Sequence, residues 1–179
     1  MADPVAEREE RFGAFLVQQI DAHSLPKPFL EQLRHEFSAN RYHYEAVAEL
    51  NHMQFLRTVV FWTVTEMLSV AEEPANDMML VFEEAASNIV RHSYQPDDVK
   101  WFGFTLSRED DRIRFELRDR GEGGKNPELP AKLAQISKEG RPPLQHRGGL
   151  GLYLIARMMD EMEYHPGGEV NRWVMWKTC

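Results

Sequence analysis

The sequence predicts a two-layer α/β sandwich, in which helices cover one face of a mixed, mostly antiparallel sheet. The chain has 179 residues, enough for one hydrophobic core and a small appendage. Apolar and polar residues alternate in two adjacent segments, 100–107 and 112–118, joined by the turn Glu109-Asp110-Asp111, which indicates a hairpin. Neither G-x-G-x-x-G after an early strand nor G-x-x-x-x-G-K-[ST] occurs, which argues against a doubly wound fold.

The first part of the chain predicts a helical hairpin. Apolar residues recur at helical spacing from Phe12 to Ile20, and again from Phe29 to Phe37 after two prolines. We therefore expect a helical extension at 1–40, ahead of a main domain at 41–179. The elements expected next are a short strand at 42–49, a helix at 53–70, a connection at 72–75, and a helix from the N-cap Asn76 to about Ser93.

The last part of the chain begins with a long Gly-, Pro-, Lys- and Arg-rich segment. Residues 121–149 are predicted to form a loop with one short helical patch near 129–136, and a loop of this length is typical of a lid. A helix at 150–162 and a strand at 170–177 follow, separated by Gly167-Gly168. Helices and strands in this order favour helices on one face of the sheet.

Composition excludes several functions. With 21 basic and 29 acidic residues the net charge is -8, and no basic stripe is present, so direct nucleic-acid binding is not expected. Cys179 is the only cysteine, which excludes an intramolecular disulfide and a cysteine-based zinc site. No secretory signal or apolar membrane span is visible, so we expect a soluble, cytoplasmic protein without a membrane partner.

A polar stripe marks the helix expected at 76–93. Glu84, Asn88 and His92 are spaced four residues apart and therefore share one helix face. The Asn88 carboxamide oxygen is a hard ligand suited to Mg²⁺ that bridges nucleotide phosphates, and Glu84 could orient or deprotonate an attacking hydroxyl or water. The alternative is an ordinary solvent-facing stripe on an amphipathic helix.

A second motif, Asp119-x-Gly121-x-Gly123, follows the strand expected at 112–118. The glycines permit close backbone approach, and a carboxylate at a strand end can accept a hydrogen bond from an exocyclic amine such as that of adenine. A simple turn after a strand is the alternative, because Asp and Gly are common there.

The third motif is the most specific of the three. It comprises Arg147, Gly148, Gly149, Leu150 and Gly151, directly before an apolar helix. Free amides at a helix N-terminus bind phosphate oxygens, and Arg147 could add a positive charge at the terminal phosphate. The alternative is a flexible hinge. The order and spacing of the three motifs together predict an ATP site.

These motifs resemble the ATP-binding domain shared by gyrase, a heat-shock chaperone, mismatch-repair ATPases and histidine kinases. Within this superfamily, residues 82–94, 119–123 and 147–155 with Met159-Asp160-Glu161 are most similar to the serine/threonine kinases that act as bacterial anti-sigma factors. The resemblance covers roughly 42–178. It implies the Bergerat ATP-binding fold, with ATP and Mg²⁺ as cofactors.

The resemblance also implies residue roles. Glu84 is the candidate base, Asn88 the magnesium ligand and Asp119 the adenine partner. The adenine loop contains Gly121 and Gly123, and the phosphates are held by Arg147 with Gly149 and Gly151, flanked by Gly148 and Leu150. His146 stands where relatives often carry an acidic or polar residue, and 1–40 has no counterpart in the minimal family domain.

The leading hypothesis is an ATP-dependent protein serine/threonine kinase in a partner-switching system. It would phosphorylate a serine of a small antagonist protein and otherwise sequester a sigma factor, and it could form a homodimer through the N-terminal extension. One alternative is a nucleotide-gated protein-binding module without kinase activity. Another is an orphan histidine-kinase catalytic domain, with His35-Glu36 on an N-terminal helix as its phospho-acceptor, although the following residues do not continue that pattern.

Overall fold

A single six-stranded sheet forms the centre of the computed structural model, which describes residues 4–23, 27–47, 49–122, 150–167 and 169–179. Its strand order is β1-β2-β3-β4-β6-β5, and each neighbouring pair of these strands is antiparallel. The strands are β1 Arg34–Phe37, β2 Arg41–Val47, β3 Trp101–Glu109, β4 Arg112–Asp119, β5 Glu161–His165 and β6 Asn171–Thr178.

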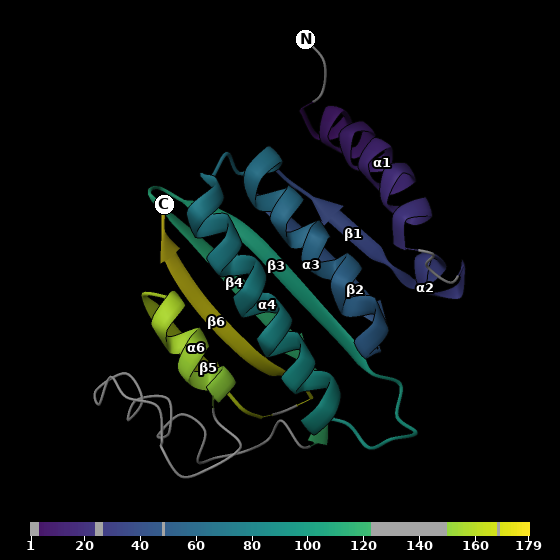
Figure 1. Cartoon of the computed structure of the whole chain (residues 1–179), viewed down its shortest axis with the longest axis vertical. Coiled ribbons are helices and arrows are strands. Elements are labelled where there is room, and N and C mark those ends of the chain that lie inside the picture. The colour runs from purple at the N-terminus through teal and green to yellow at the C-terminus, as the bar shows by residue number, and fades with distance from the viewer. Residues whose placement is uncertain (1–3, 24–26, 48, 123–149, 168) are drawn as a thin grey trace.

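The described helices cover one face of this sheet and leave the other face open. Figure 1 shows α3, α4 and α6 side by side across the sheet, with α1 near the edge formed by β1. The helices are α1 Pro4–His23, α2 Lys27–Gln32, α3 Met53–Trp62, α4 Glu72–His92 and α6 Leu150–Met158, with a 3₁₀ turn, η1, at Leu50–His52 and a π-helical turn, η2, at Thr63–Met67. Together these elements confirm the predicted α/β sandwich.

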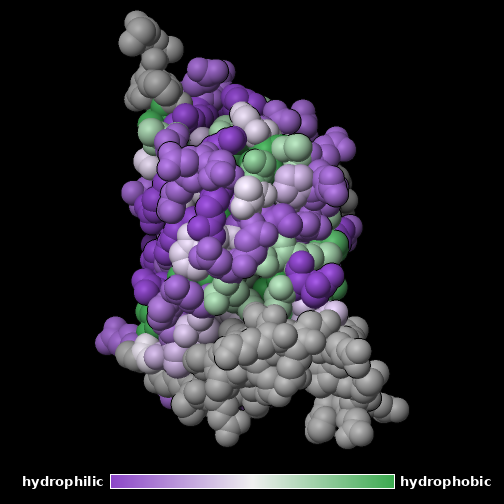
Figure 2. Space-filling model, turned by 90° about the vertical axis from the view of Figure 1, so that its left-hand side faces the viewer, coloured by the Kyte–Doolittle hydropathy of each residue, from purple (hydrophilic) through white to green (hydrophobic). Residues whose placement is uncertain are grey.

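The core lies between the helices and the sheet because both contribute an apolar face. Buried apolar side chains alternate along most of β3 and β4, and α4 buries apolar residues at helical spacing. Phe82 of α4 packs against Phe104 of β3 with ring centroids 5.0 Å apart. The side of the molecule in Figure 2 is mostly hydrophilic over the described residues, with hydrophobic groups in small areas. This core fixes α4, and therefore its polar stripe, over the centre of the sheet.

The second N-terminal helix is shorter than predicted. The prediction of a helix that continues to Phe37 was wrong over its last turn. Helix α2 ends at Gln32, and β1 begins at Arg34. Pairing with the edge of β2 stabilises this strand and buries Phe37. His35 therefore lies on a strand, where its Nε2 is 2.7 Å from the Glu9 carboxylate. The helical position that would have favoured His35 as a phospho-acceptor is absent.

Two further boundaries differ from the predictions. The helix expected at 150–162 ends at Met158, and Glu161–His165 forms β5, which pairs with β6 and buries Tyr164. Helix α4 begins at Glu72 rather than after Asn76. Pro74 is tolerated in its first turn because backbone N–H groups there have no partner within the helix, so the missing N–H of proline costs no hydrogen bond. The short helical patch predicted near 129–136 lies outside the described residues.

Candidate functional site

Asp119 is a buried carboxylate at the end of β4. Its exposed fraction is 0%, and its Oδ1 accepts hydrogen bonds from the Gly121 amide at 2.9 Å and from Asn171 Nδ2 at 3.0 Å. Its Oδ2 is also buried but accepts no hydrogen bond from the part of the chain that the structure describes. A buried acceptor without a donor is costly, so this oxygen is poised to accept a hydrogen bond from a ligand.

Burial raises the pKa of Asp119 above its ordinary value of 3.8, because desolvation disfavours the charged form. The hydrogen bonds from Asn171 and Gly121, with the Ser93 hydroxyl, act in the opposite direction but are outweighed. The carboxylate is thus held in a site where a hydrogen-bond donor would favour its charged form.

Asn171 is a site residue that the motif analysis missed. Its Nδ2 donates to Asp119 Oδ1 and also to the Gly121 carbonyl at 2.8 Å, so one side chain ties the end of β4 to the loop after it. The signal in the sequence was an asparagine in an inward position of the last strand, in step with Trp173 and Met175. What it could not reveal was the partner, because Asp119 lies 52 residues earlier in the chain.

Tyr94 is a second residue that the motif analysis missed. Its hydroxyl donates to the Trp101 carbonyl and accepts from the Arg120 amide at 2.9 Å, which links the end of α4 to β3 and β4. Burial raises the pKa of Tyr94 to about 12, so the hydroxyl stays protonated and keeps both roles. The residue positions the loop that follows Asp119.

Gly121 lies where no side chain fits. A Cβ at this position would lie well under 3.0 Å from the Ser93 carbonyl group, so the loop after β4 packs directly on the backbone at the end of α4. This close approach, rather than a positive φ angle, is the reason for glycine here.

We expect Gly121→Ala to lower the free energy of unfolding by about 2–3 kcal/mol, because backbone atoms must move to accept the methyl group. Gly13→Ala is the matched control, since a Cβ there meets nothing within 4 Å on helix α1. That variant should be more stable than the wild type by about 0.5–1 kcal/mol. Urea unfolding of the three proteins checks the opposite signs, and equal changes would contradict the close approach.

Glu84 and Asn88 lie together on α4, both half-buried, as their helical spacing predicts. Asn88 Nδ2 is 3.5 Å from Glu84 Oε1. A Cβ on Gly151 would overlap the Glu84 carboxylate, so the first turn of α6 packs against this part of α4. Segments more than sixty residues apart in sequence therefore meet at one place. His92, the third residue of the stripe, is exposed.

The third motif is described only in part. Leu150 is the first residue of α6, with its backbone alone described, and Gly151 follows it in the helix. The other predicted site residues lie outside the described residues: Gly123, Arg147, Gly148 and Gly149. The structure thus brings the polar pair of α4 to the N-terminus of α6, the helix end that stabilises negative charge.

The residues present suit an adenine nucleotide with Mg²⁺. The buried Asp119 Oδ2 can accept one hydrogen bond from an amine. The oxygen atoms of Glu84 and Asn88 are hard metal ligands next to a helix N-terminus. No group of three or more His, Cys, Asp or Glu residues that could hold a metal occurs in the described ranges. Mg²⁺ does not require one, because it keeps several waters and binds through one or two protein groups and substrate phosphates.

Comparison with known proteins identifies the domain. Residues 46–177 match the model of the histidine kinase-like ATPase domain. The chain belongs to this family. Domains of the family bind ATP, which agrees with the buried acceptor at Asp119 and with the polar pair on α4. The predicted family resemblance is confirmed.

Relatives within the family are bacterial serine kinases. Over 104 residues the chain is 32% identical to "Serine-protein kinase RsbW" of Bacillus cereus (strain Q1) and to that of Bacillus thuringiensis subsp. konkukian (strain 97-27), and 31% identical to that of Bacillus mycoides (strain KBAB4). Each match covers 56% of this chain and 62% of the relative, so the chain spans less than two thirds of these proteins.

None of the helices in the described ranges combines the length and apolar character needed to cross a bilayer.

Proposed function

We propose that this protein is an ATP-dependent serine kinase of the partner-switching type. It phosphorylates a serine of a small antagonist protein, and it sequesters a sigma factor when the antagonist is phosphorylated. The single observation that carries the proposal is the meeting of Glu84 and Asn88 with the N-terminus of α6 inside a histidine kinase-like ATPase domain. The similarity to serine-protein kinases supports serine as the acceptor.

Each residue has a proposed role that follows from its chemistry. Asp119 accepts the adenine amine through Oδ2, and Asn171 and Gly121 hold its other oxygen in place. Asn88 holds Mg²⁺ through its carboxamide oxygen. Glu84, on the same helix face, accepts the proton of the serine hydroxyl as its oxygen bonds to the terminal phosphorus of ATP and the bond from that phosphorus to ADP breaks.

The phosphates are held at the N-terminus of α6. Free amides and the dipole at a helix N-terminus favour negative charge, and Gly151 allows the close approach to Glu84. We propose that Arg147, Gly148, Gly149 and Leu150 complete this grip and that Gly123 completes the adenine loop. Asn88 would hold Mg²⁺ beside this helix end, where the metal would supply positive charge to the phosphoryl oxygens. The catalysis asked of the protein is mostly positioning and electrostatic stabilisation.

Phosphotransfer to a small candidate antagonist protein, chosen from the genes that neighbour the gene for this chain, tests the proposal. With ATP labelled on the terminal phosphate, we expect acid-stable label on one serine of that protein, and none when EDTA removes Mg²⁺. Asn88→Ala should reduce labelling, and rising Mg²⁺ should restore part of it, because the variant loses one metal ligand. Labelling that is independent of Mg²⁺, or absent although Mg²⁺ and ATP bind, would overturn the kinase assignment.

A further inference from the structure

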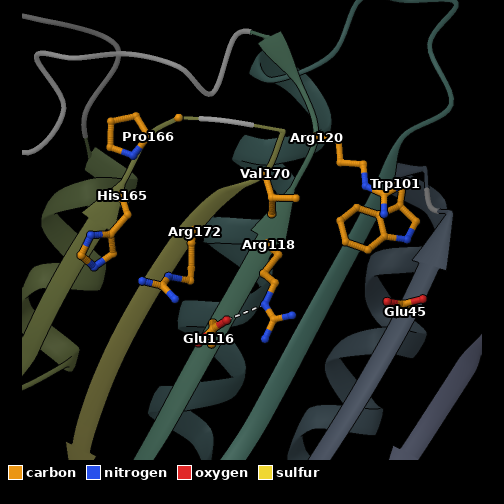
Figure 3. Close-up of a pocket in the computed structure, with 10 residues that line it drawn as sticks. Glu45, Trp101, Glu116, Arg118, Arg120, His165, Pro166, Val170 and Arg172 are labelled. Carbon is orange, nitrogen blue, oxygen red and sulfur yellow. Dashed lines mark hydrogen bonds and ion pairs between the residues drawn. The ribbon is translucent and has the colours of Figure 1, made fainter.

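A second groove lies on the open face of the sheet, opposite the helices. It has a volume of about 580 Å³ and is built from the ends of β2, β3, β4 and β6 with the β5–β6 connection (Figure 3). Its ionisable lining residues are Glu45, Glu116, Arg118, Arg120, His165 and Arg172. The groove therefore carries three guanidinium groups on a protein whose net charge is -8.

Strand register places three of these side chains in one row. Arg118 of β4 is the direct cross-strand partner of Arg172 of β6, and Arg172 is in turn the partner of His165 of β5. On the other side Arg118 pairs with Gly103 of β3, which presents no side chain to the groove. Like charges directly opposite each other in a sheet are destabilising, so this row is electrostatically costly without a counter-charge.

Among the described residues, the carboxylates next to the row are already paired with other side chains: Glu163 lies 2.9 Å from His165. Glu116 is almost fully buried, and it is shared between Arg118 and Arg114. Burial would raise its pKa, but the hydrogen bonds from Arg118 and Arg114 outweigh that effect and lower the pKa, so Glu116 is charged. The other carboxylate of the groove, Glu45, lies 3.4 Å from His43, so no carboxylate of the described residues pairs with Arg172.

Arg120 and Arg172 pair with no carboxylate of the described residues. Arg120 lies over the ring of Trp101, 4.2 Å from its centroid, and Arg172 forms no hydrogen bond or ion pair with another described residue. In Figure 3 the Arg118 side chain lies beside Glu116 and Arg120 lies beside Trp101, while Arg172 extends from β6 toward the side of His165. The Arg172 guanidinium is therefore left available to an anion that enters the groove.

We propose that this groove binds a small organic phosphate, held by Arg172 and Arg118 with Arg120 at one side. Planar guanidinium groups bind phosphate oxygens in a bidentate manner, and a phosphate ester carries close to two negative charges at neutral pH. A ligand with that charge offsets the excess that the row of arginines creates. The volume lies within the range of small-molecule sites.

This site is separate from the proposed nucleotide site. Asp119 and its partner Asn171 occupy the next rung of the same two strands, and their side chains are buried on the helix side of the sheet. The groove side chains alternate with them and point to the opposite face. The inference does not depend on kinase activity.

Isothermal titration with inorganic pyrophosphate, in EDTA so that Mg²⁺ does not contribute, tests the groove. We expect Arg172→Gln to weaken pyrophosphate binding about tenfold or more, because a charge-assisted pair of hydrogen bonds is lost. The matched control is Arg41→Gln, an exposed arginine on the same sheet face in the neighbouring strand β2 and outside the groove, which should bind pyrophosphate as the wild type does. Equal weakening in the two variants would overturn the proposal.

Three further measurements separate specific binding from other causes. The unliganded Arg172→Gln protein should melt at a temperature no lower than the wild type, since one repulsive charge is removed. If that variant does not fold, Arg120→Gln replaces it with the same expected loss of pyrophosphate affinity. Sodium chloride at matched ionic strength should not reproduce the thermal stabilisation by pyrophosphate, and an equal effect of the two salts would contradict a built site. Both variants should bind Mg²⁺-ADP as the wild type does. This result keeps the test of the groove distinct from the test of the proposed kinase function.

Discussion

Glu84→Gln is expected to slow phosphotransfer about 100- to 10,000-fold, the contribution typical of a general base, while Mg²⁺-ATP affinity changes little. Glutamine has nearly the same shape and keeps an oxygen toward Asn88, so the packing of α4 against Gly151 should persist. What it loses is the ability to accept a proton from the attacking hydroxyl. Single-turnover rates with saturating ATP, together with calorimetric ATP affinity, measure the two quantities separately.

The neighbouring Glu83→Gln is the matched control for this variant. Glu83 carries the same charge on the same helix but pairs with Arg57 at 2.8 Å near the surface. Exposed ion pairs contribute about 0–1 kcal/mol, so this variant should remain stable and active. An unchanged transfer rate in Glu84→Gln would refute the role of Glu84 as the base. Loss of ATP binding in that variant would instead assign it to nucleotide binding.

Asp119→Asn is expected to weaken Mg²⁺-ADP binding about 100-fold, equivalent to about 3 kcal/mol. The buried Oδ2 that meets the adenine amine becomes an NH₂ group, so two donors face each other where a donor and an acceptor met. The contacts of Oδ1 to Gly121 and Asn171 are retained by the asparagine oxygen, and the fold should stay intact. Calorimetry with Mg²⁺-ADP and with Mg²⁺-GDP reports affinity and adenine preference.

The pH dependence of stability distinguishes this effect from unfolding. Because burial raises the pKa of Asp119, the folded protein binds the proton more tightly than the unfolded chain does. Its contribution to stability is therefore fully present below the ordinary pKa and is lost as the pH rises through the raised pKa. Asp119→Asn removes this loss, so the unliganded variant should be at least as stable as the wild type at neutral pH.

Thermal unfolding across the acid-to-neutral range checks that sign, with Asp97→Asn at an exposed position as the control that should change neither stability nor affinity. A variant that binds Mg²⁺-ADP like the wild type would refute the adenine contact. A strongly destabilised variant would indicate that Asp119 acts only in folding.

Much of the fold could be predicted from local patterns. The alternation in β3 and β4 and the helical spacing on α4 are properties of neighbouring residues, and both elements form close to where they were expected. The departures occur where a segment is stabilised by a distant partner. Arg34–Phe37 becomes a strand because β2 offers an edge, and Glu161–His165 does so because β6 offers the other.

The candidate site divides in the same way. Glu84 and Asn88 could be placed together from helical spacing alone, and the order of the three motifs indicated a common site. The contribution of Asn171 could not be predicted, since it depends on the pairing of β4 with β6. The reasons for Gly121 and Gly151 also come from close approach to segments far away in the chain.

By itself the sequence determined the α/β class, the family and the chemical types of the residues in its motifs. These depend on side-chain identity and on the spacing of residues within single elements. Only the tertiary structure decided that one oxygen of Asp119 is held by Asn171 while the other stays without a donor among the described residues, and that arginines line up across the open sheet face. Burial and strand register bring together residues far apart in the chain, so no local pattern encodes them.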